Sequence, residues 1–137
     1  MKHLIAIIVA ILLAGCTSLP KDHEIKKANY GKKPSDYKII VKAYYNKTLN
    51  SPEDALYENI SKPVRYWIAN GLDGALYGYL VCVSINSKTF FGAYTGYRSD
   101  AFIIRNGRVA KYVEDGIWWG EILCKDGGVA KPEDKVS

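Results

Sequence analysis

The chain has few of the side chains that most often carry catalysis or bind metals. Its 137 residues include only two histidines, three cysteines and one methionine. After the first fifteen residues His23 is the only histidine, whereas Ser-His-Asp and Cys-His hydrolases need a histidine as general base. Zinc sites need clusters of histidine and cysteine, and no phosphate-binding loop of the G-x-x-x-x-G-K-[ST] type is present. We therefore expect no catalytic residue of these classes, no metal site and no cofactor.

No apolar run is long enough to cross a membrane, but a shorter one lies at the N-terminus. A lysine and a histidine precede an unbroken apolar stretch from Leu4 to Ala14, which is the layout of a secretory signal. A transmembrane helix would need roughly twenty apolar residues. The stretch ends in Leu13-Ala14-Gly15-Cys16, which resembles the lipobox of bacterial lipoproteins. That resemblance implies a signal peptide over residues 1–15 and lipid on Cys16 that anchors the protein to a membrane.

The residue after the lipobox cysteine bears on the location. Thr17 stands where an aspartate commonly retains lipoproteins in the inner membrane of Gram-negative bacteria. In such a host we expect the outer membrane, with the folded part facing the periplasm. The alternative is an ordinary signal peptide in which Cys16 occurs by chance.

Two cysteines remain once Cys16 is assigned to lipid. In an oxidising compartment Cys82 and Cys124 are predicted to form a disulfide. Neither belongs to a C-x-x-C motif. A reactive or metal-binding thiol remains the alternative.

The positive charge of the chain is concentrated near its N-terminus. Residues 21–47 contain eight lysines and only three acidic residues, Asp22, Glu24 and Asp36. Prolines, a glycine and the absence of an apolar period predict a flexible basic tether over residues 16–34. The lysines could contact anionic lipid headgroups or form a solvated spacer. Nucleic acid is not an expected partner, because the predicted location lies outside the cytoplasm.

Apolar periodicity and turn residues predict a single α+β domain over residues 35–126. It is expected to pack one or two N-terminal helices on an antiparallel sheet of about four to five strands. Residues 127–137, rich in glycine, lysine and aspartate, are predicted to be a disordered tail. The predicted helices cover residues 36–49 and 52–59, and the predicted strands cover 65–69, 77–85, 90–97, 101–105, 108–112 and 117–123.

Several blocks together resemble a family of small proteobacterial lipoproteins of unknown activity. The first block contains Tyr30-Gly31, Pro34, Tyr37, Leu49, Pro52 and Ala55. The second runs from Val81-Cys82 through Asn86-Ser87-Lys88 to Gly92, Tyr94, Thr95 and Gly96. The chain departs from the family's pattern at Asn50, Asp54, Thr89 and Ala93. The resemblance implies a shared fold and a cell-envelope location, and it implies no catalytic residue.

Aromatic side chains are the remaining feature of the composition. Eleven tyrosines and three tryptophans supply large contact areas with polar tips, which are common at binding surfaces. The expected binding surface on the sheet comprises Tyr94, Tyr97 and whichever of Trp118 and Trp119 faces outward. Gly92 and Gly96 would either let a partner approach this strand closely or only permit a bulge with the tyrosines in the core.

Two functions follow as hypotheses. The first is a non-enzymatic envelope lipoprotein that binds a protein partner or the cell wall through its sheet. The alternative is a small peptidoglycan-directed hydrolase, or an inhibitor of one, with a carboxylate pair drawn from Glu114, Asp115 and Glu121.

Overall fold

The computed structural model describes residues 19–71 and 74–130. The predicted signal peptide and Cys16 lie outside these ranges. The α+β prediction is confirmed, because helices accompany a five-stranded antiparallel sheet. The helical elements are α2 (Asp22–Lys27), α3 (Tyr37–Thr48) and the 3₁₀ turns η1 (Pro52–Asp54) and η3 (Glu114–Gly116). The strands are β1 (Leu56–Ile60), β2 (Val64–Ala69), β3 (Ala75–Lys88), β4 (Tyr94–Arg105), β5 (Arg108–Val113), β6 (Ile117–Trp118), β7 (Glu121–Ile122), β8 (Cys124–Lys125) and β9 (Gly128–Val129).

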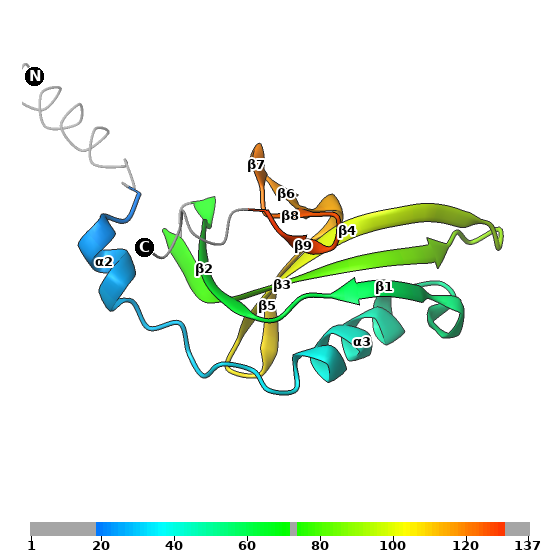
Figure 1. Cartoon of the computed structure of the whole chain (residues 1–137), viewed down its shortest axis with the longest axis horizontal. Helices are drawn as coiled ribbons and strands as arrows, with labels where there is room; N and C mark the ends of the chain where they lie inside the picture. The colour runs from blue at the N-terminus through cyan, green and yellow to red at the C-terminus, as the bar shows by residue number, and fades with distance from the viewer. Residues whose placement is uncertain (1–18, 72–73, 131–137) are drawn as a thin grey trace, which may run out of the picture.

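The long strand β3 organises the sheet. Its first part pairs with β2 and its last part with β1, so these two strands share one edge of β3. Strand β4 pairs along the other edge, and β5 pairs with β4 through a hairpin. The Asn106-Gly107 turn of that hairpin has φ angles of 51° and 75°, as the Asn-Gly pair predicts. Figure 1 shows β3 and β4 running together to a turn at the end of the molecule opposite α2.

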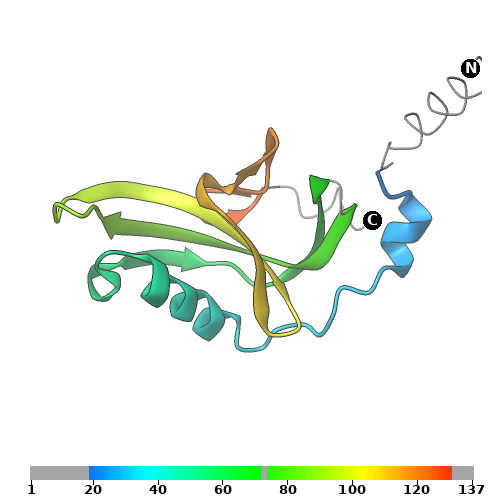
Figure 2. The same ribbon diagram turned by 180° about the vertical axis from the view of Figure 1, so that it is seen from behind.

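Both faces of this sheet are covered over its central part. Helix α3 packs on one face, where Val41 and Tyr45 meet β3 and β4 in a buried cluster. The short strands β6–β9 cover the other face, where Leu123 and Cys124 pack against the same two strands. Figure 2 shows these two layers from behind. Coverage on both sides explains why residues 80–85 are all buried, since alternating side chains of a strand point to opposite faces.

The predicted disulfide between Cys82 and Cys124 is confirmed. It joins the middle of β3 to β8, with a Cα–Cα distance of 5.6 Å. The bond therefore fastens the strands β6–β9 to the sheet face that lies opposite α3.

The second predicted helix is wrong beyond Asp54. The capping serine and proline before it begin only the 3₁₀ turn η1, and residues 56–60 form β1 instead of helix. Pairing with β3 decides the outcome, because it places Tyr57 beside Tyr45 with ring centroids 5.9 Å apart. Local helix signals are weak compared with burial of this kind.

Two predicted strands, 90–97 and 101–105, are parts of the single strand β4. Phe90, Phe91 and Gly92 lie outside it, in the turn that joins β3 to β4. The register slips by one residue between the pairs Asn86–Tyr97 and Lys88–Tyr94, and Gly96 with φ of 95° lies in this bulge. Of the two roles predicted for Gly96, the backbone therefore shows the bulge.

The predicted last strand is a small hairpin. Residues 117–123 form β6 and β7, joined by Trp119 and Gly120 with φ angles of 49° and 79°. The predicted disordered tail also begins too early. Asp126 and Gly127, with φ angles of 51° and 73°, form a turn between β8 and β9. Residues 131–137 lie outside the described ranges.

The described part of the predicted tether, residues 19–34, contains ordered contacts, which corrects the flexible interpretation there. Residues 22–27 form α2, in which the Lys21 backbone N–H donates to the Glu24 carboxylate at 2.7 Å. The Tyr30 side chain is buried, and its hydroxyl donates to the Ile25 carbonyl oxygen at 3.0 Å. Its ring meets Tyr77 of β3 edge-on at 5.5 Å between centroids. No helix within residues 19–71 and 74–130 is long and apolar enough to span a membrane.

Candidate functional site

The sheet face opposite α3 is not covered at its far end, where it carries an open pocket. We call this the outer pocket. It has a volume of about 410 Å³. Its lining comes from β1, β3, β4 and the β8–β9 turn and consists of Glu58, Asn59, Ser84, Tyr97, Arg98, Ser99 and Asp126.

Strand register explains why small polar side chains form the floor of the outer pocket. Asn59 is opposite Ser84, and Ser84 is opposite Ser99, so the three form a row across β1, β3 and β4 on one face. Ser84 donates its hydroxyl hydrogen to the Glu58 carboxylate at 2.8 Å. The floor therefore presents hydroxyl, amide and carboxylate groups.

A glycine closes one side of the pocket. The Gly127 backbone N–H donates to the Ser99 hydroxyl at 2.8 Å, and the Asn59 amide donates to the Gly127 carbonyl oxygen at 2.8 Å. A Cβ at position 127 would lie 2.7 Å from the Cβ of Ser84. Only glycine lets the β8–β9 turn approach the floor this closely, and the turn holds the exposed Asp126 at the rim.

The two tyrosines predicted on the sheet are both exposed. Tyr94 is 44% and Tyr97 is 54% exposed, so neither fills the core. The Tyr94 hydroxyl donates to the Asp54 carbonyl oxygen at 2.9 Å, and the Lys88 ammonium lies 5.3 Å from the centre of its ring. The Gly96 N–H in the bulge donates to the Asn86 side-chain oxygen at 3.0 Å. These contacts hold the Tyr94 ring at the surface and fix the backbone next to Tyr97.

The two tryptophans have different environments. Trp118 packs against the core of the sheet, and its indole N–H donates to the Ala69 carbonyl oxygen at 2.6 Å. The Lys111 ammonium lies 4.3 Å from the centre of the Trp118 ring. Trp119 is 77% exposed because it lies in the turn between β6 and β7. It belongs to a prominence separate from the outer pocket, so the structure does not bring the four predicted aromatics into one surface.

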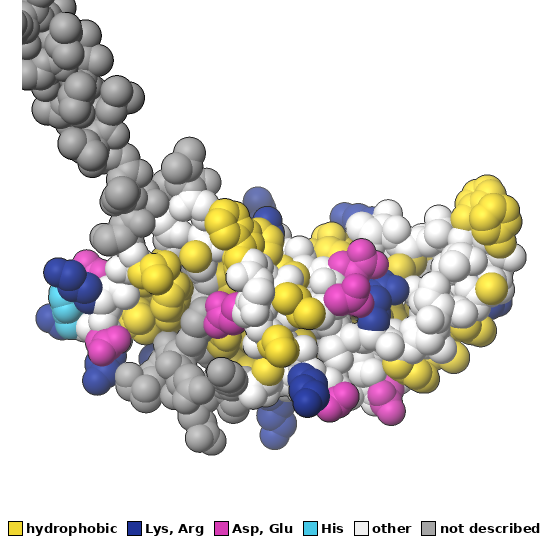
Figure 3. Space-filling view, turned by 90° about the horizontal axis from the view of Figure 1, so that it is seen from above, with side chains coloured by type: hydrophobic (Ala, Val, Ile, Leu, Met, Phe, Trp, Pro, Cys, Tyr) yellow, Lys and Arg dark blue, Asp and Glu magenta, His cyan; other side chains and the backbone are white. Residues whose placement is uncertain are grey.

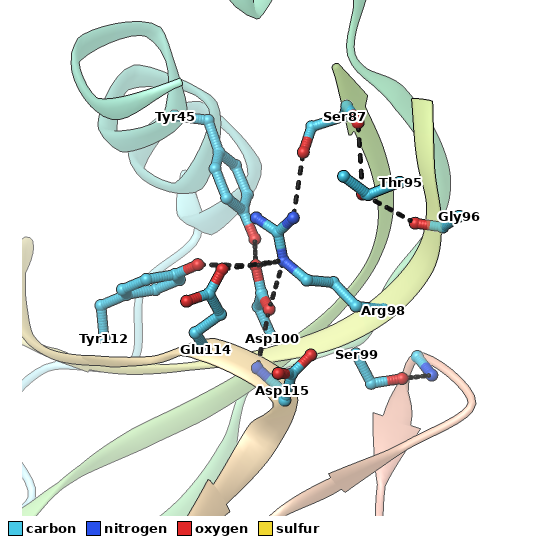
Figure 4. Close-up of polar contacts among 11 residues, drawn as sticks. Tyr45, Ser87, Thr95, Gly96, Arg98, Ser99, Asp100, Tyr112, Glu114 and Asp115 are labelled. Atoms are coloured by element: carbon cyan, nitrogen blue, oxygen red, sulfur yellow. Dashed lines mark hydrogen bonds and ion pairs between the residues drawn. The ribbon is translucent and has the colours of Figure 1, made fainter. Parts of the chain in front are cut away.

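A buried carboxylate beneath the pocket was not predicted. Asp100 is completely buried on the α3 side of β4, and donors from several elements converge on it (Figure 4). The hydroxyls of Tyr45 and Tyr112 donate to its Oδ2 at 2.7 and 2.8 Å. The Arg98 Nε donates at 3.0 Å and the Asp115 backbone N–H at 3.0 Å to its Oδ1.

These contacts and the burial of the cluster raise the pKa values of three of the donors. Burial raises the pKa of Tyr45 and that of Tyr112 well above 10, and the negative charge of Asp100 raises both further. Burial of Arg98 opposes its charge, but the Asp100 carboxylate outweighs this and raises the pKa of the guanidinium. All three groups therefore stay protonated donors, and the Asp100 cluster links α3, β4, β5 and η3 through one carboxylate.

Each of the three acidic residues considered for catalysis makes a contact within the fold. Glu121 accepts a hydrogen bond from the Tyr66 hydroxyl at 3.0 Å. Glu114 lies 3.7 Å from the Arg98 Nε, and Asp115 contributes its backbone N–H to Asp100. Among the described residues, no group of three or more histidine, cysteine, aspartate and glutamate side chains is placed to hold a metal ion.

Comparison with known proteins adds no assignment to this geometry. The chain matches no protein-family model, no curated protein and no solved structure. The candidate site therefore stands on the described residues alone.

Sequence reasoning missed the Asp100 cluster and most of the pocket lining. One signal was present, because Arg98 and Asp100 are two residues apart at the start of the apolar run of β4. In a strand this spacing places two opposite charges on the same face. The partners Tyr45 and Tyr112 come from distant segments, and nothing in the local pattern indicates them.

Proposed function

We propose that the protein is a membrane-anchored envelope lipoprotein that binds a partner, a protein or the cell wall, through the outer pocket and its two tyrosines. The observation that carries this proposal is the uncovered end of the sheet. Over the central part of the sheet α3 and strands β6–β9 cover both faces. At the uncovered end Tyr97 is exposed in the lining of a polar pocket, and Tyr94 is exposed further along the same strand.

The chemistry of the surface supports a binding role. Tyrosine adds a large rigid contact area with a hydroxyl that can bond to a partner, and it is enriched in interfaces for that reason. Next to Tyr97, the Glu58 carboxylate and the exposed Asp126 offer acceptors. The hydroxyls of Ser84 and Ser99 are bonded to Glu58 and Gly127 and shape the polar floor. Such a surface suits a partner rich in hydrogen-bond donors, such as a polar peptide or a glycan.

The anchoring part of the proposal rests on the lipobox-like Leu13-Ala14-Gly15-Cys16. Stable anchoring takes at least two acyl chains, which a lipidated N-terminal cysteine would provide. With Thr17 after it, we propose the outer membrane of a Gram-negative host, with the described domain facing the periplasm. The family resemblance of the Tyr30 and Val81 blocks supports the same location.

A photo-crosslinking experiment in the native host tests the binding role. A photoreactive phenylalanine analogue at position 97 should capture a discrete envelope component. The same analogue at position 47, at the exposed end of α3, is the matched control. Tyr97→Ala should abolish capture from the same analogue placed at the exposed position 94, without lowering the melting temperature, because the Tyr97 ring is more than half exposed.

Two results would contradict the proposal. One is capture that is equal from positions 97 and 47, which would indicate random contact. The other is a Tyr97→Ala variant that loses several kcal/mol of stability, because truncation of an aromatic side chain costs about 3–5 kcal/mol only in a core.

A further inference from the structure

The turn between β3 and β4 presents the most exposed aromatic side chains of the described chain. Phe90 is 82% and Phe91 is 92% exposed, the two highest values among the large apolar side chains. Their rings touch edge-on, with centroids 5.7 Å apart. Figure 3 shows hydrophobic side chains gathered at this end of the molecule, the end furthest from α2. Two phenylalanines in water are an unfavourable arrangement unless an apolar phase receives them.

Two backbone hydrogen bonds form within this turn. The Thr89 N–H donates to the Ala93 carbonyl oxygen at 2.8 Å, and the Gly92 N–H donates to the Thr89 carbonyl oxygen at 2.9 Å. Polar backbone groups that enter hydrocarbon must be satisfied internally, because no water is present there. The turn meets that requirement in part, so its backbone is suited to entry into the outer part of a bilayer.

The turn carries no charged side chain, and the nearest charged residue before it in the chain is Lys88. Residues 89–97 contain no charged side chain. Lys88, at the start of this run, forms an ion pair with Asp54 at 2.9 Å, and Glu53 lies exposed nearby. Tyr94 lies between the phenylalanines and these charges. At a membrane interface, apolar side chains lie deepest, amphipathic aromatic rings lie at headgroup depth and charged groups lie in water. The tip has its apolar, tyrosine and charged side chains in the same order.

The shape of the tip favours a bilayer over a protein groove. The two rings project from a hairpin end, and a Cβ built at Gly92 would meet nothing within 4 Å. From this we propose that Phe90 and Phe91 insert into the outer part of a lipid bilayer and give the protein a membrane contact at the end of the domain remote from α2. The charged side chains beside the tip are Lys88, Asp54 and Glu53 and provide no excess of positive charge, so the contact depends on apolar burial and not on anionic lipid. This inference goes beyond the proposed function and does not depend on the outer pocket.

A site-specific fluorescence experiment tests it. The full chain, purified from membranes, is reconstituted into phosphatidylcholine vesicles with a polarity-sensitive dye on a cysteine at position 93 (Ala93→Cys). The Cys82–Cys124 disulfide does not react, and the parent chain treated in the same way sets the background. We expect a blue shift of the dye emission and quenching by spin labels on the lipid acyl chains. A dye on Lys47→Cys, on α3, should show neither.

The phenylalanines are tested with the dye kept in place. Phe90→Ser with Phe91→Ser should remove the shift and most of the quenching at position 93. The melting temperature should not change, because both side chains are largely exposed. Absence of quenching in the parent chain, or quenching that persists in the double-serine variant, overturns the proposal. A shift that appears only when envelope proteins are added, without acyl-chain quenching, also overturns it and assigns the tip to a protein. The partner captured from position 97 is not part of this experiment, so either proposal can fail alone.

Discussion

Replacement of Asp100 by asparagine is the sharpest test of how the helix layer is held to the sheet. The substitution keeps the shape of the side chain and removes its charge. The hydroxyls of Tyr45 and Tyr112 can rotate to accept from the new amide, but the Arg98 guanidinium loses its counter-charge. Only 17% of the Arg98 side chain is exposed. The nearby Glu114 is 3.7 Å away and 65% exposed, so it compensates weakly.

The expected cost follows from that unpaired charge. Removal of one partner from a buried ion pair costs about 3–5 kcal/mol of folding free energy. At roughly 4 °C per kcal/mol for a domain of this size, the melting temperature of Asp100→Asn should fall by roughly 12–20 °C. Chemical unfolding under oxidising conditions, followed by circular dichroism, measures the free energy directly.

A second variant tests whether the cost of Asp100→Asn comes from the unpaired charge of Arg98. Removal of both charges, in Arg98→Met with Asp100→Asn, should cost less than Asp100→Asn alone. It takes away the unpaired guanidinium, while the amide still provides hydrogen-bond partners for Tyr45, Tyr112 and the Asp115 N–H. A loss below about 1 kcal/mol for Asp100→Asn, or a double variant that is less stable than the single one, would refute the role given to this cluster.

The remaining predictions concern pH, lipidation and the disulfide. Because the folded-state pKa values of Tyr45 and Tyr112 are raised, their stabilisation is present below pH 10 and is lost above it, as unfolded tyrosines ionise. The free energy of unfolding should fall by up to about 2.7 kcal/mol per pH unit from these two residues, with a shallower slope in Tyr112→Phe. Cys16→Ser should abolish incorporation of labelled palmitate and signal cleavage by the lipoprotein peptidase, and unchanged labelling would exclude the lipoprotein interpretation. Replacement of Cys82 and Cys124 by alanine should cost about 4 kcal/mol on the chain-entropy model, given their separation of 42 residues, and an unchanged unfolding midpoint would contradict this.

Sequence reasoning succeeded where burial and local preference agree. The helix around Val41 has an apolar period and lies on the sheet, and the Asn106-Gly107 hairpin has a turn that few other residue pairs allow. Cys82 and Cys124 could be paired because, once Cys16 was assigned to lipid, only these two cysteines remained.

It failed where distant pairing overrides local signals. The segment after Pro52 has helix-start residues, but β3 has an open edge, and residues 56–60 complete it. Gly127 was assigned to the disordered tail, because the contacts that fix the Asp126-Gly127 turn come from Ser99 and Asn59, which no local pattern connects to it. The outer pocket is therefore a product of register, since its floor assembles from three strands that only the folded sheet aligns.

The disulfide has a consequence for the order in which the two faces of the sheet mature. The partners on the α3 face, from Val41 to Tyr112, are complete before residue 117 is made. Cys82 lies on the other face, under Leu123 and Cys124, which come later in the chain. In a chain that lacks residues 117–124, Leu123 and Cys124 would not cover Cys82, so its thiol would stay open to oxidants or to a foreign thiol. Such a truncated chain would therefore carry a reactive thiol on an uncovered apolar surface, and closure of this face and formation of the disulfide depend on the same last residues.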